Sequence, residues 1–223
     1  MEILSKKHQK INKLFDFMNI GFTILRMNWR NVYLDCDEVL LQTAQTHALF
    51  LQQEYNIIVD KNAYPSHWVF PKNSGLDFNK STELFTQTHY FVEVPAVSGA
   101  KTAIQKLKNT GASLSVISSI STNSVARNNR LQNLHNAFGD VFDDIILLPL
   151  GWANKLTQYK KLPKGIVIDD SIFNIQDAIS CGHDAVFISL LQNKEHIAIA
   201  RDLLIPTANS LLECVDNHMI KQR

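Results

Sequence analysis

The chain has 223 residues, of which 45% are hydrophobic and 19% are charged. This composition supplies a packed core and excludes a globally disordered chain, and the length suits one large domain or one domain with a smaller insert. The 22 basic residues nearly balance the 21 acidic ones, which leaves a net charge of +1. Proteins that bind nucleic acid polymers or membrane surfaces concentrate positive charge, so this balance argues against both functions.

Residues 1–30 precede the first predicted strand and form a candidate N-terminal extension. Hydrophobic side chains recur in it at the spacing of an amphipathic helix: Leu4, Ile11, Leu14, Phe15 and Met18. Polar residues interrupt the one stretch that resembles a signal peptide, no run of 18 hydrophobic residues marks a membrane span, and the three cysteines lie far apart. We therefore predict a helical extension on a cytoplasmic protein with reduced thiols and no membrane partner.

From residue 31 onward, short runs rich in valine and isoleucine alternate with segments of helical periodicity. The runs, which predict buried strands, lie at 31–35, 113–118, 144–148, 165–169 and 185–189. The helical segments lie at 101–109, 124–136, 154–162 and 172–181. Such alternation predicts an α/β fold with a doubly wound parallel sheet, and we assign residues 31–42 and 96–223 to this core.

Residues 43–95 interrupt the alternation. A structureless loop of this length is rare inside a compact domain, so we expect a small, mainly helical domain inserted after the first strand. Helices are predicted at 43–55 and 81–91, with a turn-rich stretch between them. The segment contains no arginine and is rich in aromatic residues: Tyr64, Trp68, Phe70, Phe78, Phe85, Tyr90 and Phe91.

Acidic pairs stand where two predicted strands end. Asp35 and Asp37 follow the first strand, and Asp169 and Asp170 close the fourth. The carboxyl ends of parallel strands meet at one edge of a sheet, where ligands bind. A single acid there would be explained as a helix cap or a turn, but two pairs crowd charges that repel one another. A hard cation such as Mg²⁺ removes that repulsion, so a magnesium site is predicted at this edge.

Hydroxyl and ammonium groups accompany the acids. Ser118 and Ser119 end the second strand, and Lys155 lies in the first turn of the helix before the fourth strand. Lys160, Lys161 and Lys164 are alternatives to Lys155, but we expect them to form a solvated face. Other residues have structural interpretations: Cys36 is expected in the core because side chains alternate along a strand, and Arg127 and Arg130 are expected on an exposed helix face.

The segment Asp35-Cys36-Asp37-Glu38-Val39 resembles the first motif of the haloacid-dehalogenase-like (HAD) superfamily of phosphohydrolases. Ser118, Lys155 and the Asp169-Asp170 pair match its second, third and fourth motifs, in order. The insert after the first strand matches the position of that superfamily's cap domain. The resemblance implies a magnesium-dependent phosphomonoester hydrolase that works through an aspartyl-phosphate.

The resemblance also implies roles for the matched residues. Asp35 would be the nucleophile and Asp37 the general acid and base, which favours phosphate-ester hydrolysis over dehalogenation. Mg²⁺ would be held by the Asp35 side chain, the Asp37 backbone carbonyl and Asp169, with Asp170 close to it or bound through water. The phosphate would be bound by Ser118, Ser119 and Lys155.

A narrower resemblance concerns the substrate. Residues 91–100 look like the cap-to-core return of the 5'(3')-deoxyribonucleotidases, although Glu38 replaces a usual glycine and Ile120 a usual proline. The Asp-x-Asp-Glu sequence looks more like the RNA-polymerase-tail phosphatases, which have little or no cap at this position. We expect a small phosphorylated metabolite, with nucleoside monophosphates preferred because aromatic cap residues, Trp68 above all, could stack on a base.

Two other functions stay open at this point. One is a phosphatase for another metabolite or for a phosphoprotein. The other is a HAD-fold binding protein that has lost turnover. The intact aspartates argue against lost turnover, because a scaffold has no need of such a costly cluster. Glu38 keeps that function open, since an extra acid near the metal could misplace a substrate phosphate.

Overall fold

The structure is a computed structural model that describes residues 27–61, 63, 65–150, 154–189 and 194–219. The amphipathic helix predicted within residues 1–30 rests on residues 4–18, which lie outside the described residues. None of the described helices is long and apolar enough to cross a membrane.

Six strands form one sheet in which every neighbouring pair is parallel. The strand order is β3-β2-β1-β4-β5-β6. The strands are β1 (Asn31–Leu34), β2 (Ser113–Ile120), β3 (Asp144–Pro149), β4 (Ile166–Asp169), β5 (Asp184–Ile188) and β6 (Thr207–Ala208). The five predicted strands are confirmed, while β6 spans two residues and is too short to show a sequence pattern.

Helices cover both faces of this sheet. They are α5 (Ala100–Asn109), α6 (Ser124–Phe138), α7 (Asn154–Tyr159), α8 (Ile172–Ser180), α9 (Lys194–Asp202) and α10 (Leu211–Cys214), the last continued by the π-helical turn η2 (Val215–Met219). Val32 and Leu34 of β1 join a hydrophobic cluster with α5, α6 and α10, whereas Tyr33 joins a second cluster with α7, α8 and α9. This arrangement confirms the doubly wound α/β fold.

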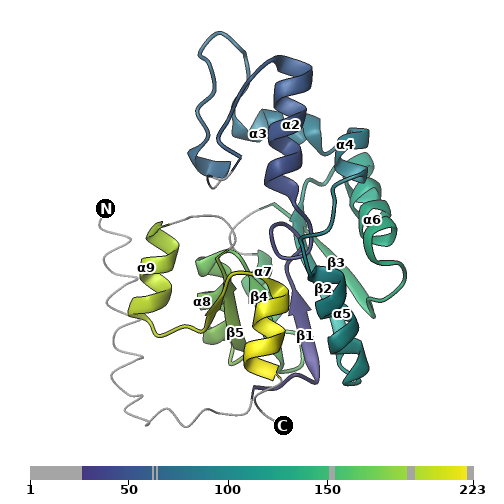
Figure 1. Ribbon diagram of the computed structural model, residues 1–223, viewed down its shortest axis with the longest axis vertical. Coiled ribbons are helices and arrows are strands. Elements are labelled where there is room, and N and C mark those ends of the chain that lie inside the picture. Colours follow the sequence, from purple (N-terminus) through teal and green to yellow (C-terminus); the bar gives the residue numbers. More distant parts are fainter. Residues whose placement is uncertain (1–26, 62, 64, 151–153, 190–193, 220–223) are drawn as a thin grey trace.

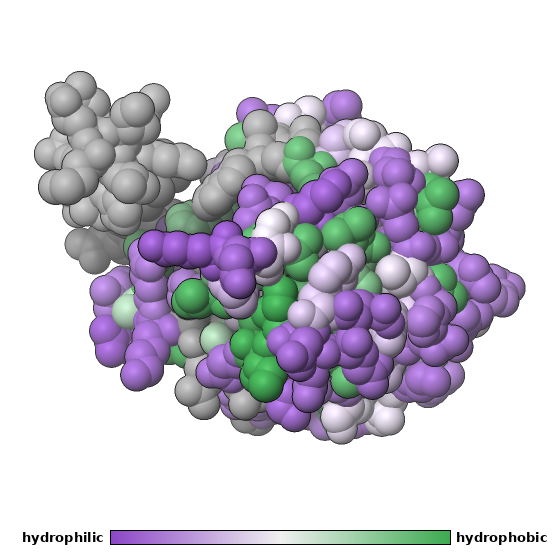
Figure 2. All heavy atoms as spheres, turned by 90° about the horizontal axis from the view of Figure 1, so that it is seen from above, coloured by the Kyte–Doolittle hydropathy of each residue, from purple (hydrophilic) through white to green (hydrophobic). Residues whose placement is uncertain are grey.

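Residues 43–95, which the sequence predicts as an inserted domain and which are called the insert from here on, follow β1 and are mainly helical. It contains α2 (Thr43–Tyr55), the 3₁₀ turn η1 (Pro65–His67), α3 (Phe78–Phe85) and α4 (His89–Val92). Figure 1 shows α2, α3 and α4 beyond the end of the sheet that β1 points to. In Figure 2, which looks down on this end, hydrophobic residues gather in the middle of a mostly hydrophilic surface.

The prediction of a single helix at 81–91 is wrong, because the helical conformation is interrupted between α3 and α4. The hydroxyls of Thr86 and Thr88 donate to the carbonyls of Glu83 and Phe85, at 3.1 and 2.7 Å. Threonine side chains that bond to nearby backbone offer the chain an alternative to continued helix. The predicted helix at 43–55 is confirmed as α2.

Candidate active site

The predicted site residues come from three adjacent strands and one helix. Asp35 follows β1 directly, Asp169 ends β4 and Ser118 lies in β2. Leu34 of β1 pairs with Ile168 of β4, so the two aspartates that follow stand level at the carboxyl edge of the sheet. Helix α7 contacts β2 and carries Lys155 to the same place.

Lys155 lies between two of the carboxylates. Its Nζ donates to Oδ1 of Asp35 at 2.5 Å and to Oδ2 of Asp169 at 2.7 Å, and all three side chains are at least nine-tenths buried. Burial alone lowers the pKa of Lys155, but the attraction of Asp169 and Asp35 outweighs it and raises the pKa well above its ordinary value. The three alternative lysines at 160, 161 and 164 are exposed.

Two donors from the start of α8 fix the orientation of Asp169. The backbone N–H of Ser171 donates to its Oδ1 at 2.8 Å, and Nδ2 of Asn174 donates to Oδ1 and Oδ2 at 3.0 and 3.1 Å. Oδ2 of Asp169 also accepts the hydrogen bond from Nζ of Lys155. Every side-chain oxygen of this buried acid is therefore held by a donor.

Asp35, Asp169 and Asp170 form a carboxylate cluster in which one oxygen of each lies within 4.8 Å of the others. Burial, with the charges of Asp169 and Asp37, raises the pKa of Asp35 to about 7 despite Lys155. Burial, then the charges of Asp35 and Asp169, raises the pKa of Asp170 well above its ordinary value. Three carboxylates share one ammonium, and carboxylate oxygens are the ligands that Mg²⁺ prefers, so the residues fit this ion.

Ser118 has a fully buried side chain, and its Oγ has no hydrogen-bond partner among the residues that the structure describes. A buried hydroxyl without a partner is costly, and an incoming oxygen acceptor would relieve that cost. Ser119, the next residue of β2, is partly exposed and points to the opposite face of the strand. The two serines therefore do not present their hydroxyls to the same side.

Asp37 is held by a residue that the sequence did not indicate. Nη2 of Arg130 donates to Oδ1 of Asp37 at 2.6 Å, and the Thr43 hydroxyl donates to the same oxygen. The expectation that Arg130 and Arg127 are exposed is wrong: Arg130 is 2% exposed, and Arg127 is half-buried with Nη2 donating to the Leu147 carbonyl at 3.0 Å.

Cys36 is fully buried, which confirms its predicted place in the core. Its Sγ lies 3.0 Å from Nη1 of Arg130, so the arginine touches two consecutive residues of the loop after β1. Burial raises the pKa of the Cys36 thiol, which keeps it in the neutral form.

Glu38 is bonded to the first turn of α2. It is buried, and its Oε1 accepts the backbone N–H of Ala44 at 2.6 Å. Its φ of 60° lies in the left-handed region, where glycine is favoured. Gln42 at the N-terminus of α2 makes no side-chain capping bond, so Glu38 supplies that bond from the loop after β1. Burial raises the pKa of Glu38 to about 7.

The aromatic residues of the insert mostly form its own core. Trp68, Phe85 and Phe91 are 8%, 1% and 1% exposed, and Nε1 of Trp68 donates to the Asp60 carbonyl at 3.0 Å. The buried His47 ring stacks on Phe85, with centroids 4.5 Å apart. The burial of Trp68 contradicts the expectation that its ring stacks on a base, and Tyr64 lies outside the described residues.

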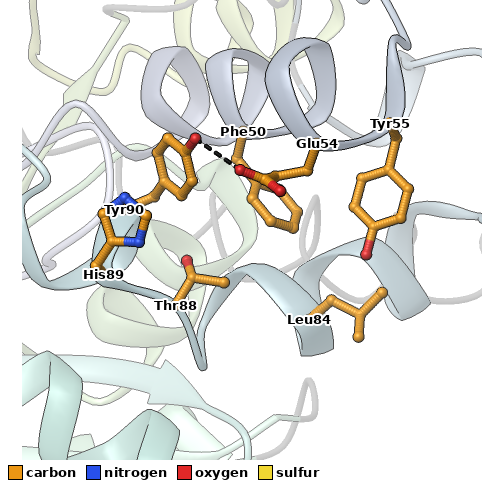
Figure 3. Close-up of a pocket in the computed structure, with 7 residues that line it drawn as sticks. All are labelled: Phe50, Glu54, Tyr55, Leu84, Thr88, His89 and Tyr90. Carbon is orange, nitrogen blue, oxygen red and sulfur yellow. Dashed lines mark hydrogen bonds between the residues drawn. The ribbon is translucent and has the colours of Figure 1, made fainter.

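A surface pocket of about 340 Å³ opens between α2 and the α3–α4 segment (Figure 3). Phe50, Glu54 and Tyr55 face it from α2, and Tyr90 OH donates to Oε1 of Glu54 at 2.8 Å. Its lining within the described residues comes entirely from the insert. The carboxylate cluster is therefore a separate site.

Comparison with solved structures places this geometry in a known fold. A haloacid dehalogenase-like hydrolase from Streptococcus pneumoniae aligns with a TM-score of 0.59 at 15% identity, covering 86% of this chain and 98% of that chain. D,D-heptose 1.7-bisphosphate phosphatase from B. bronchiseptica, solved with magnesium and phosphate, gives 0.55 at 14% identity over 87% and 99%. The chain has the HAD-like fold.

CbbY from Rhodobacter sphaeroides, solved with phosphate, is another structure with this HAD-like fold. It has a TM-score of 0.57 at 15% identity and covers 82% of this chain and 95% of that chain. No protein-family model and no curated protein matches the sequence. At these identities the likeness establishes the fold alone.

Three contacts of the site were not predicted: Arg130 and Thr43 on Asp37, and Asn174 on Asp169. Asn174 stands five residues after Asp169, in the first turn of a predicted helix, and this short spacing could have indicated it. Arg130 is 93 residues from Asp37, and no local pattern connects the two.

Proposed function

We propose that this protein is a magnesium-dependent phosphomonoester hydrolase that works through an aspartyl-phosphate. The observation that carries the proposal is Lys155, which is buried between Asp35 and Asp169 at the edge of the sheet. The hydroxyl of Ser118 from the adjacent strand supports it, because no described residue offers this hydroxyl a hydrogen bond. Together these groups offer a nucleophile, a positive charge and a hydrogen-bond donor to one phosphoryl group.

In this proposal, an oxygen of Asp35 attacks phosphorus while the bond to the leaving oxygen breaks. Asp37, in the form that carries a proton, gives that proton to the departing alkoxide and is left as a carboxylate. Asp37 then accepts a proton from water as the water oxygen attacks phosphorus, which breaks the bond to Asp35 and releases inorganic phosphate. Lys155 and the Ser118 hydroxyl stabilise the negative charge of the phosphoryl oxygens.

Mg²⁺ would be held by Asp35, Asp169 and Asp170, together with the Asp37 backbone carbonyl, and would neutralise charge between the carboxylates and the phosphate. Its positive charge would also favour the ionised form of Asp35, which is the form that attacks phosphorus. This effect would oppose the burial that raises the pKa of Asp35. Ser119 points away from Ser118, so in this scheme any contribution from it to phosphate binding comes from its backbone N–H.

The substrate class we propose is a small phosphorylated metabolite, with the insert acting as a cap over the leaving group. A preference for nucleoside monophosphates stays a prediction from the sequence. Stacking on Trp68 no longer supports it, because that ring is buried. Among the predicted aromatic residues, the partly exposed rings of Phe70, Phe78 and Tyr90 are still open to such a contact.

The test is hydrolysis of p-nitrophenyl phosphate and of a panel of phosphorylated metabolites that includes nucleoside monophosphates. We expect activity with Mg²⁺, none in excess chelator, and a loss of about 10³-fold or more for Asp35→Asn, equivalent to about 4 kcal/mol of barrier. Asp202→Asn, at an exposed aspartate of α9, is the matched control and should keep full activity. Asp35→Asn with more than a tenth of the wild-type rate, or full activity in chelator, would overturn the proposal.

A further inference from the structure

Arg130 is the largest of the fully buried side chains in the described part of the chain, and it carries a permanent charge. Its guanidinium lies beside the loop after β1, where Asp37 Oδ1 accepts from Nη2 at 2.6 Å. Resting on the proposed function, we infer that Arg130 is a positioning residue that aligns Asp37 for proton transfer. Nothing in the resemblance to the HAD superfamily assigns this arginine a part.

The contacts of Arg130 satisfy its buried charge only in part, which lowers the stability of the fold. Its other neighbours are the neutral thiol of Cys36, at 3.0 Å from Nη1, and the ring of Phe91, whose centroid is 4.3 Å from Cζ. Its buried Nε has no hydrogen-bond partner among the described residues. A buried charge that lacks part of its hydrogen bonding is often less stable than a well-packed apolar side chain, so fold stability does not account for an arginine here.

The backbone around Arg130 is fixed by its neighbours on α6. Nδ2 of Asn133 donates to the carbonyls of Val92 and Val94 at 3.1 and 2.9 Å, and Nδ2 of Asn129 donates to the Thr86 carbonyl at 3.1 Å. These bonds tie α6 to the returning end of the insert on either side of Arg130. The guanidinium therefore has a set position relative to Asp37.

Both donors to Asp37 end on the same oxygen. Arg130 and Thr43 contact Oδ1, no donor from the described residues reaches Oδ2, and 37% of the Asp37 side chain is exposed. Oδ2 is therefore the oxygen that can carry the proton to the leaving group and take one from water. Without Arg130 the carboxylate would keep its chemical capacity but lose its fixed orientation.

This assignment predicts a specific kinetic signature. Misalignment of the proton donor matters most where the leaving alkoxide is strongly basic, as with an alkyl phosphate, and least for p-nitrophenolate, which leaves without a proton. The leaving group departs before the aspartyl-phosphate is hydrolysed, so its effect is measured by kcat/KM, which reports the steps up to formation of that intermediate. The kcat/KM for an alkyl phosphate should therefore fall much further than the kcat/KM for p-nitrophenyl phosphate.

The experiment compares Arg130→Met with Arg127→Met, its matched control one turn earlier on α6. With Mg²⁺ present, we expect Arg130→Met to lose about 10²-fold in kcat/KM on an alkyl phosphate, at least tenfold more than on p-nitrophenyl phosphate. Arg127→Met should leave the ratio of the two rates unchanged. Arg130→Lys, which retains the charge, should show an intermediate ratio, and it carries the test if Arg130→Met fails to fold.

Equal losses of kcat/KM on both substrates would overturn the role of Arg130 while leaving the phosphatase proposal intact. Wild-type protein that hydrolyses nothing in the panel with Mg²⁺ would overturn both. The Asp35→Asn result separates these outcomes, because it reports on the nucleophile and does not involve Arg130.

Discussion

Glu38 offers a sharp test of how burial affects this site. Its carboxylate is buried and accepts the Ala44 N–H, and its pKa is raised to about 7. Glu38→Gln removes the ionisable proton but keeps an oxygen that can accept the same N–H. The substitution therefore isolates the cost of the buried charge from the benefit of the helix cap.

The sign and size of the effect follow from the difference between the two states. The folded protein holds the Glu38 proton up to about pH 7, whereas the unfolded chain releases it near the ordinary value of 4.5. The stability from this group is thus fully present below pH 4.5 and lost as the pH rises through 7, by about 3 kcal/mol. Because glutamine does not ionise, Glu38→Gln should exceed the wild type in unfolding free energy by about 2–3 kcal/mol at pH 8 and match it near pH 4.5.

Urea unfolding followed by circular dichroism at both pH values measures this difference. Chelator must be present throughout, because a bound cation would offset the carboxylate charge. Glu93→Gln, at an exposed glutamate after α4, is the control and should track the wild type at both pH values. A Glu38→Gln variant that is less stable than the wild type at pH 8, or equally shifted at both values, would refute the reasoning.

Two further predictions concern the insert and the lysine. Trp68→Ala should cost about 3–5 kcal/mol of unfolding free energy, because the ring fills the core of the insert. It should leave the ratio of kcat/KM for a nucleoside monophosphate to kcat/KM for p-nitrophenyl phosphate within about threefold of the wild-type ratio. A stable variant with a shifted ratio would contradict this. Lys155→Met leaves Asp35 and Asp169 without their shared counter-charge, so the Tm of the variant in chelator should fall below that of the wild type. Added Mg²⁺ should raise the Tm of the variant by more than it raises the Tm of the wild type. An equal rise in Tm for both proteins would contradict this prediction.

The sheet and the approach of the acids could be predicted because local patterns determine them. Each of the five predicted strands is a short valine- and isoleucine-rich run between helical segments, and parallel topology then brings their carboxyl ends together. Asp35 and Asp169 meet for that reason alone. Strand β6 was missed because two residues carry no periodicity.

The contacts around Asp37 and inside the insert could not be predicted, because they depend on packing between distant segments. Arg130 lies on a polar helix, where arginines are usually solvated, but it is buried beside the ring of Phe91 of α4 and the side chains of Cys36 and Asp37. In the same way, the sequence around Trp68 does not reveal that His47 and Phe78 lie against its ring. The long-range packing that buries these side chains also decides which of them are free to meet a ligand.

The side-chain amide of Asn133 joins the two backbone carbonyls of Val92 and Val94 to the core. The return arm of the insert is thereby anchored. The start of α2 is anchored as well, by the Glu38 cap and by the bonds of Gln42 to the carbonyls of Pro95 and Ala96 at 2.9 and 3.0 Å. Adaptation to a leaving group of another size would therefore fall to the stretch between residues 56 and 77. The anchored arm would keep the relative position of Arg130 and Asp37 through such changes, so the selectivity of the proposed phosphatase would diverge while the contact between these two residues is preserved.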